Sequence, residues 1–302
     1  MNRLQANICM LTVLVCWAFE VILLKNIPHN VPGPAVMTAT NFIGFIILFL
    51  AFFSRVRKNF TFALWWKICG FAVLNLLYNL LGLESLRYLP TSVCIFQCST
   101  ALLVSPFILL ALHETVHRRE WLGSLLVLAG IFCSLDWNFP SDHLWGLILL
   151  MTHAIAWSVY LFYLNRLAKK EDSITIATLI LGSVTILGFV TWFVIDPYTI
   201  FSLEYSQAFV SSIFADGYFI CVLATVLSIF AQKYLSFLDT VAINSLYPAI
   251  AAAMALLLPP ILVDAIDMTY RLTISIVLVS FGTFVCEADW SKLRQQWLEW
   301  RG

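Results

Sequence analysis

Apolar runs of close to 20 residues follow one another along nearly the whole chain. A helix of about 20 apolar residues spans the hydrocarbon core of a bilayer, and lipid offers no partners for backbone N–H and C=O groups. Only 11% of the 302 residues are charged, whereas a soluble domain carries about 25%. The sequence therefore predicts an all-α membrane protein with ten transmembrane helices, at residues 7–25, 35–53, 62–83, 91–112, 121–137, 143–164, 174–195, 208–235, 240–262 and 270–286.

Lysine and arginine predict how these spans are oriented. If the N-terminus is cytoplasmic, 14 basic residues fall on the cytoplasmic side, and only Lys25, Arg87 and Arg271 fall on the other side. This bias follows the positive-inside rule and requires an even number of spans. We therefore expect a multi-pass protein of the cell (inner) membrane with both termini in the cytoplasm. The 14 are Arg3, Arg55, Arg57, Lys58, Lys67, Arg118, Arg119, Arg166, Lys169, Lys170, Lys233, Lys292, Arg294 and Arg301.

The second half of the chain repeats features of the first half in the same order. The matching positions are Trp17 and Trp157 in spans one and six, residues 89–91 and 238–240 at the start of spans four and nine, and residues 130–132 and 282–284 at the end of spans five and ten. Five spans is an odd number, so the two halves have opposite orientations, which is typical of secondary transporters. We predict two inverted five-helix repeats, residues 1–140 and 141–287, followed by a cytoplasmic amphipathic tail, residues 288–302.

Several of these residues also match a known family. Trp17 is followed eight residues later by Lys25; Thr91 to Leu112 leads to Glu114 and then to Gly123 and Gly130; Thr240 to Leu262, with Pro248, leads to Asp264 and then to Gly282. In these features the chain resembles the drug/metabolite transporter superfamily, in its EamA-type ten-helix branch. It departs from the family at Ser99 and Thr100, where the first half has no proline, and near Asn41, where a basic residue is missing. The resemblance implies ten helices, cytoplasmic termini and efflux of amino acids or related metabolites.

Glu20 is the most informative polar residue, because it lies inside the first span. A charged side chain within a bilayer is costly and usually functional. Glu20 shares a helix face with Trp17, three residues earlier, whereas Lys25 points elsewhere. Two interpretations stay open. Glu20 binds a proton or a positive group of a substrate, or it makes a structural hydrogen bond or meets water near the membrane surface.

Polar and aromatic residues also form stripes at helical spacing on spans three, four, six and nine. The stripes are Asn75, Tyr78 and Asn79; Cys94, Gln97 and Cys98; His153, Trp157 and Tyr160; and Asn244, Tyr247 and Pro248. Such stripes face the bundle interior, where they serve either as contacts between helices or as a binding site. We predict that the substrate-binding residues are Trp17, Glu20, Asn75, Tyr78, Asn79, Gln97, His153, Trp157, Tyr160, Asn244 and Tyr247.

The leading hypothesis is a secondary transporter, not an enzyme, for a small polar metabolite, working by alternating access. No arginine lies deep in a span, so an amino acid, another zwitterion or a cation fits better than a phosphate. Protons are a candidate partner through Glu20 or His153. The lipid bilayer is the other partner, and we expect no cofactor, metal or nucleic acid; the oligomeric state stays open.

Two alternatives stay open beside the transporter. His113, Glu114 and His117 match the H-E-x-x-H pattern, which on a helix builds the zinc site of a metalloprotease. The second alternative is a membrane scaffold that transports nothing.

Overall fold

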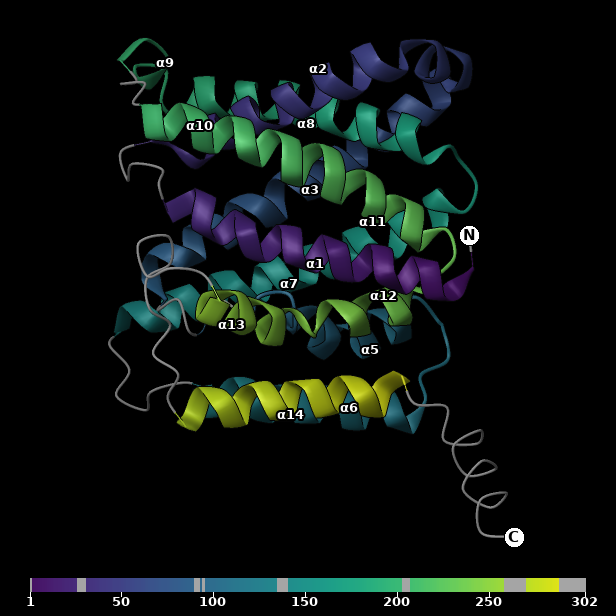
Figure 1. Ribbon diagram of the computed structural model, residues 1–302, viewed down its shortest axis with the longest axis vertical. Coiled ribbons are helices and arrows are strands. Elements are labelled where there is room, and N and C mark those ends of the chain that lie inside the picture. The colour runs from purple at the N-terminus through teal and green to yellow at the C-terminus, as the bar shows by residue number, and fades with distance from the viewer. Residues whose placement is uncertain are drawn as a thin grey trace, which may run out of the picture.

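The computed structural model describes residues 2–25, 31–89, 93, 96–134, 141–202, 207–257 and 270–287. These residues form helices without any β-strand, and the helices lie side by side across the molecule (Figure 1). The predicted tail, residues 288–302, lies outside the described residues, as do Cys94 and Asp264.

The helices overlap the predicted spans, and at least one helix lies at each of the ten spans. They are α1 (Arg3–Lys25), α2 (Gly33–Asn59), α3 (Phe62–Tyr88), α5 (Thr100–Ala111), α6 (Arg118–Ser134), α7 (Ser141–Ala168), α8 (Ser173–Ile195), the short α9 (Thr199–Ser202), α10 (Gln207–Asp216), the π-helix η1 (Gly217–Ala224), α11 (Thr225–Gln232), α12 (Phe237–Asn244), α13 (Tyr247–Leu257) and α14 (Tyr270–Glu287). The elements α10, η1 and α11 follow one another without a break and fill span eight.

Local sequence explains where several helices begin. The Thr61 hydroxyl accepts a hydrogen bond from the backbone N–H of Leu64 at the start of α3. Ser236 and Asp239 form a reciprocal capping box at the start of α12. Pro32 precedes α2, whose first turn contains Pro34, a residue that needs no N–H partner there. These residues satisfy or remove the unpaired N–H groups of the first helical turn.

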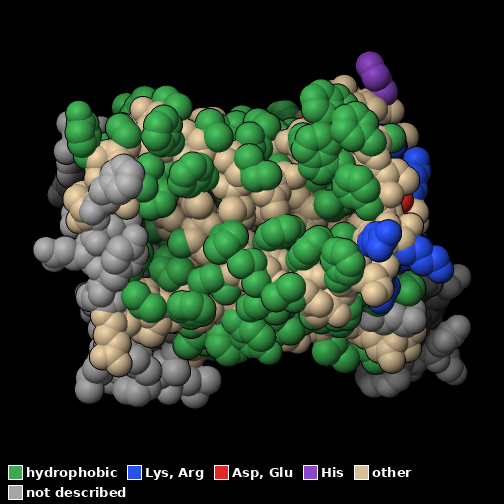
Figure 2. Space-filling model, turned by 90° about the horizontal axis from the view of Figure 1, so that it is seen from above, with side chains coloured by type: hydrophobic (Ala, Val, Ile, Leu, Met, Phe, Trp, Pro, Cys, Tyr) green, Lys and Arg blue, Asp and Glu red, His purple; other side chains and the backbone are tan. Residues whose placement is uncertain are grey.

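The outer surface is largely apolar, as is typical of a surface in contact with lipid. Six helical segments of the described chain are long and apolar enough to cross a membrane, which makes this a multi-pass membrane protein. Large apolar side chains such as Leu50, Trp66 and Val194 are more than two-thirds exposed. Figure 2 shows such side chains spread over the middle of one face, with lysine and arginine gathered at one end. Exposing so continuous an apolar surface to water is energetically unfavourable.

Helices far apart in the sequence pack in pairs. The long helices α2 and α8 pack along each other at one edge of the bundle, and α6 and α14 pack along each other at the opposite edge (Figure 1). Between these edges α3 packs on α7, and α1 packs on η1 and α11. The interior therefore lies between α1, α3, α7 and η1, and apolar side chains from all of them form one main core.

Three ion pairs join helices at the end of the bundle that carries the N-terminus. Arg3 pairs with Asp239 at 2.8 Å, Arg55 with Asp172 at 2.6 Å, and Arg166 with Glu114. All three arginines are residues for which we predicted a cytoplasmic location. Glu84 and Arg87 on α3 form a further, partly exposed ion pair, at 3.3 Å.

Asp172 combines an ion pair with a helix cap. Its carboxylate accepts hydrogen bonds from Arg55 and from the backbone N–H and hydroxyl of Thr175 at the start of α8. Burial by itself raises the pKa of Asp172, but these hydrogen bonds outweigh it and hold the pKa below its usual value. The ion pair therefore persists through the neutral pH range.

Candidate functional site

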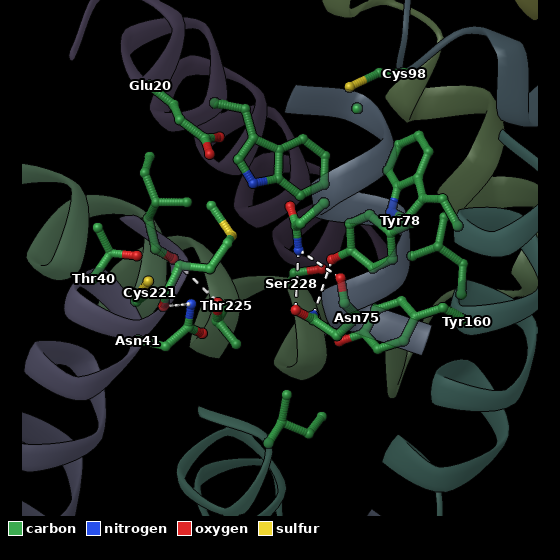
Figure 3. A pocket seen from close by; sticks show the side chains of 18 of the residues that line it. Glu20, Thr40, Asn41, Asn75, Tyr78, Cys98, Tyr160, Cys221, Thr225 and Ser228 are labelled. Atoms are coloured by element: carbon green, nitrogen blue, oxygen red, sulfur yellow. Dashed lines mark hydrogen bonds between the residues drawn. The ribbon is translucent and has the colours of Figure 1, made fainter. Parts of the chain in front are cut away.

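A cavity of about 180 Å³ lies at the centre of the bundle (Figure 3). Side chains from α1, α2, α3, α7, α8, α10, η1 and α11 line it, together with the segment before α5 and the start of α13. Ten of the eleven predicted binding residues are among them: Trp17, Glu20, Asn75, Tyr78, Asn79, Gln97, His153, Trp157, Tyr160 and Tyr247. A pocket for a drug-sized ligand measures roughly 300–1,000 Å³, so this cavity suits a smaller molecule.

Asn244 is the predicted residue that the structure places elsewhere. It is fully buried, does not line the cavity, and neither polar atom of its side chain has a hydrogen-bond partner. Its spacing from Tyr247 and Pro248 suggested one continuous helix face. The helix is interrupted at Ser245 and Leu246, between α12 and α13, so the side chains on the two sides of the break do not share a face.

One side of the cavity is acidic. Glu20 of α1 and Asp216 at the end of α10 both line it, and their charges are close enough to interact. Asp216 is only 2% exposed, and Thr40 of α2 lies beside its carboxylate, although the Thr40 hydroxyl donates its hydrogen bond to the carbonyl oxygen of Val36. The Oδ1 atom of Asp216 has no hydrogen-bond partner among the described residues. Figure 3 shows Glu20 and Thr40 on the same side of the cavity, near Cys221.

A close crossing of α2 and η1 brings this acidic side together. A Cβ atom at Gly44 would lie 2.6 Å from the Cβ of Cys221, and one at Gly217 would lie 2.8 Å from the Ile43 side chain. Only glycine allows the two backbones to approach so closely. The π-helix starts directly after Asp216, and the Thr225 hydroxyl donates to the carbonyl of Ile220, five residues earlier. Such irregular turns are frequent at functional sites.

The opposite side of the cavity is a hydrogen-bonded network on α3. The Asn79 side-chain amide donates to both the carbonyl oxygen and the side-chain Oδ1 of Asn75, at 2.9 and 3.0 Å. The Asn75 amide donates to the Tyr78 hydroxyl at 3.0 Å. The predicted stripe on span three is therefore a connected polar surface, with Tyr160 of α7 facing it in Figure 3.

His153 on α7 ties this network to the segment before α5. Its Nδ1 lies 2.7 Å from the carbonyl oxygen of Tyr78, which can only accept, so Nδ1 carries the proton. Its Nε2 then accepts from the Gln97 amide at 3.2 Å. Both ring nitrogens are thus occupied in the neutral form. Gly82 leaves the room for this contact, because a Cβ atom there would collide with the Gln97 amide.

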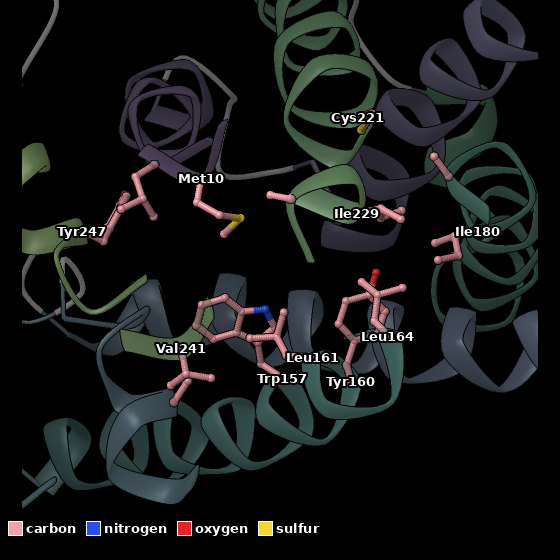
Figure 4. Packing of buried hydrophobic residues seen from close by; sticks show 14 of the residues in the cluster. Met10, Trp157, Tyr160, Leu161, Leu164, Ile180, Cys221, Ile229, Val241 and Tyr247 are labelled. Atoms are coloured by element: carbon pink, nitrogen blue, oxygen red, sulfur yellow. The ribbon is translucent and has the colours of Figure 1, made fainter. Parts of the chain in front are cut away.

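Aromatic rings form the walls of the cavity. The rings of Trp17 and Trp157, which we matched between the two halves, meet edge to face with centroids 5.8 Å apart. Tyr160 packs at 5.2 Å from Tyr78. The Tyr247 hydroxyl donates to the carbonyl oxygen of Trp17 at 3.3 Å. Figure 4 shows Trp157, Tyr160 and Tyr247 packed among the buried apolar residues, so these rings both line the cavity and hold the helices together.

Two irregular segments meet beside the cavity. Residues 96–99 form turns before α5, and Ser245 and Leu246 separate α12 from α13. The Ser99 hydroxyl donates to the carbonyl oxygen of Ser245 at 3.0 Å. Pro248 lacks an N–H and so cannot continue the hydrogen bonds of α12. The carbonyl groups that this break leaves free therefore find partners from the other half of the chain.

Sequence reasoning missed part of this site. Asp216 is the only acidic residue in the predicted span 208–235, and the rule that singled out Glu20 applies to it equally. Thr40, Thr225 and Ser228 also line the cavity. Their hydroxyls gave no usable signal, since such groups commonly hydrogen-bond to their own helix.

The H-E-x-x-H segment does not have the geometry of a zinc site. That site needs His113 and His117 one turn apart on a helix, but α5 ends at Ala111 and residues 114–117 are a loop. His113 has a left-handed φ of 58°. Glu114, the general base of the protease alternative, pairs with Arg166 instead. Among the described residues, no three histidine, cysteine or acidic side chains are grouped to hold a metal ion.

The helical bundle and its central polar cavity define a class, the multi-pass membrane proteins with a polar cavity between their helices. Residues 4–135 match the model of the EamA-like transporter family, so over this part the chain is similar to the drug/metabolite transporter superfamily. Members of the EamA family are transporters, not enzymes. The predicted resemblance is therefore confirmed.

Solved structures agree on the fold. Twenty-eight chains of known structure match this one. In one of them, a crystal structure of a protein, the match covers 95% of this chain and 97% of that chain, with a TM-score of 0.70 and 18% identity. At that identity the likeness shows the shared fold alone. No curated protein matches the sequence.

Proposed function

We propose that this protein is a secondary transporter that carries a small polar metabolite with a positive group across the cell (inner) membrane by alternating access. The single observation that carries the proposal is the central cavity, in which Glu20 and Asp216 face a surface of amide and aromatic side chains. A scaffold that transports nothing has no need for buried carboxylates in lipid. We also propose that both termini are cytoplasmic; the gathering of the paired Arg3, Arg55 and Arg166 at one end of the bundle supports this by the positive-inside rule.

The crossing of α6 and α14 supports two inverted repeats, residues 1–140 and 141–287. A Cβ atom at Gly123 would lie 2.7 Å from the carbonyl oxygen of Gly282, and one at Gly130 would lie 3.0 Å from that of Ser275. The sequence match pairs Gly130 with Gly282, which are 152 residues apart. The same offset pairs Gly123 with Ser275, so exchanging the two halves converts one contact into the other. A two-fold axis between inverted repeats would produce this pattern.

The pairing of helices has the same symmetry. Exchanging the halves converts the α3–α7 contact into the contact of α1 with η1 and α11, and leaves the α2–α8 and α6–α14 pairs unchanged. The irregular segments before α5 and between α12 and α13 are likewise equivalent, and they meet at the cavity. Interrupted helices at the junction of two repeats are typical of transporter binding sites.

Buried apolar residues lie toward the end that we place in the cytoplasm. Met10, Leu164, Ile229 and Val241 are at most 2% exposed, belong to the main core (Figure 4) and lie in the halves of their predicted spans nearer that end; Leu164 and Ile229 also line the cavity. The three ion pairs lie at the same end. In an alternating-access cycle these contacts would separate to release or admit substrate on that side.

Glu20 is the group that we assign to the positive charge of the substrate or to a coupled proton. It lies at the cavity and has no described arginine or lysine beside it there. His153, the other candidate, has both ring nitrogens occupied by Tyr78 and Gln97. Protonating His153 would convert its Nε2 from an acceptor into a donor and break the bond from Gln97, so we assign it a structural role.

The test is a flux assay with purified protein in proteoliposomes, using a panel of amino acids, primary amines and choline. We expect at least one of these compounds to be transported, and Glu20→Gln to abolish its flux. Glu84→Gln, a change in the exposed pair with Arg87, is the matched control and should leave flux unchanged. Full flux and an unchanged pH dependence in Glu20→Gln would contradict the role of Glu20. A panel without any flux would contradict the proposed function itself.

A further inference from the structure

The cavity holds two carboxylates and no compensating cation. Neither lysine nor arginine is among the described residues that line it. Asp216 is 98% buried, and its Oδ1 atom has no hydrogen-bond partner, although the side chain lines the cavity. A buried carboxylate needs either a proton or a positively charged partner. The unpartnered oxygen faces the cavity, where a cationic ligand can take the place of the proton.

We propose that Glu20 and Asp216 together bind the ammonium group of an organic amine that carries no carboxylate. This rests on the proposed transport function and names its substrate class. The ammonium lies between α1 and η1, and Thr40 of α2 lines the cavity beside Asp216. No motif in the sequence indicated Asp216. We assign it the same role as Glu20, which is to bind the ammonium group.

The side chains on the other side of the cavity make an amino acid an unsuitable ligand. The carboxylate of an amino acid needs a guanidinium, an ammonium or several free N–H donors. One N–H of Asn75 is engaged with Tyr78, the Asn79 amide is engaged with Asn75, and one N–H of Gln97 is engaged with His153. The remaining donors of these amides are neutral N–H groups, which bind a carboxylate more weakly than a cation does. The Nδ1–H of His153 is engaged with a backbone carbonyl. A second carboxylate would therefore enter an acidic cavity without a cationic partner.

The same side of the cavity is suited to the carbon chain of an amine. Tyr78, Trp157 and Tyr160 present aromatic rings to the cavity, and such rings attract alkyl chains and cations. The Oδ1 atom of Asn75 accepts from Asn79 but has a second lone pair, so it remains an acceptor for a further N–H group. A short diamine, with one ammonium at the carboxylates and a chain across the rings, matches this distribution of charge and apolar surface.

Calorimetric binding to the full-length protein in detergent tests the proposal with a matched pair of ligands. Lysine is 1,5-diaminopentane with one added carboxylate, so the two probes differ only in the group at issue. We expect 1,5-diaminopentane to bind at least tenfold more tightly than lysine at the same pH. Asp216→Asn and Glu20→Gln should each weaken the diamine at least tenfold, and Asp216→Glu should retain most of the affinity. Glu84→Gln serves as the control with full affinity, and each variant is first checked for an unchanged unfolding temperature.

Lysine binding as tightly as the diamine would overturn the proposal, and so would undiminished diamine affinity in Asp216→Asn. Absence of binding by both probes would overturn it too. None of these results affects the proposed transport function, because flux of an amino acid in proteoliposomes would still support that function.

Discussion

The crossing of α6 and α14 allows a quantitative test of the packing at the proposed repeat axis. The substitution Gly282→Ala adds a Cβ atom 2.8 Å from the carbonyl oxygen of Gly123 and 3.1 Å from the Cβ of Leu126. Ordinary contact begins at about 3.4 Å, so the two helices have to separate by about 0.6 Å. Neither partner atom lies at the end of a flexible side chain. Overpacking of this kind costs about 1–3 kcal/mol.

Gly70→Ala provides the matched control. Gly70 lies on the exposed side of α3, and a Cβ atom there has nothing within 4 Å. Replacing glycine by alanine inside a helix adds about 1 kcal/mol of helix propensity in both variants. This gain cancels in the difference between them, which therefore isolates the cost of the clash.

The assay is thermal unfolding of the purified proteins in detergent, followed by circular dichroism. A cost of about 1–3 kcal/mol corresponds to an unfolding midpoint of Gly282→Ala roughly 2–10 °C below that of Gly70→Ala. Equal midpoints would show that the crossing is not as tight as the distances indicate, and the argument for a symmetric glycine contact would lose its basis.

Three further predictions concern residues outside this crossing. Asp172→Asn should lower stability by less than about 1 kcal/mol at neutral pH, because the Arg55 pair is partly exposed. The lowered pKa of Asp172 means that this contribution is present above its usual pKa and is lost as the pH falls through the lowered value, so unfolding temperatures of the two proteins should converge in acid. His153→Ala should cost about 1–3 kcal/mol in thermal unfolding by leaving buried polar groups unpaired, whereas the exposed neighbour Thr152→Ala should cost far less; equal losses would contradict the structural role. His117→Ala should leave flux unchanged, and zinc that copurifies with the protein and is lost in this variant would revive the protease alternative.

Much of the architecture could be predicted because insertion into lipid depends on local properties of the sequence. A run of about 20 apolar residues forms a helix wherever it occurs, since the backbone can satisfy its own hydrogen bonds in no other way there. The spans, their breaks and the ten cavity residues followed from this rule and from helical spacing. Glu20 could be identified because a carboxylate stands out against an apolar span.

Relations between helices could not be predicted, because they depend on where the helices cross. Asp216 lies close to Glu20 because α1 packs on α10 and η1, and no local pattern indicates which helices will meet. Asn244 lies outside the cavity because the chain breaks after it, which changes the face that its side chain occupies. The sequence by itself determined which segments enter the membrane and which polar groups go with them. The tertiary structure alone decided which of those groups share one cavity, since side chains distant in the chain are brought together only by packing.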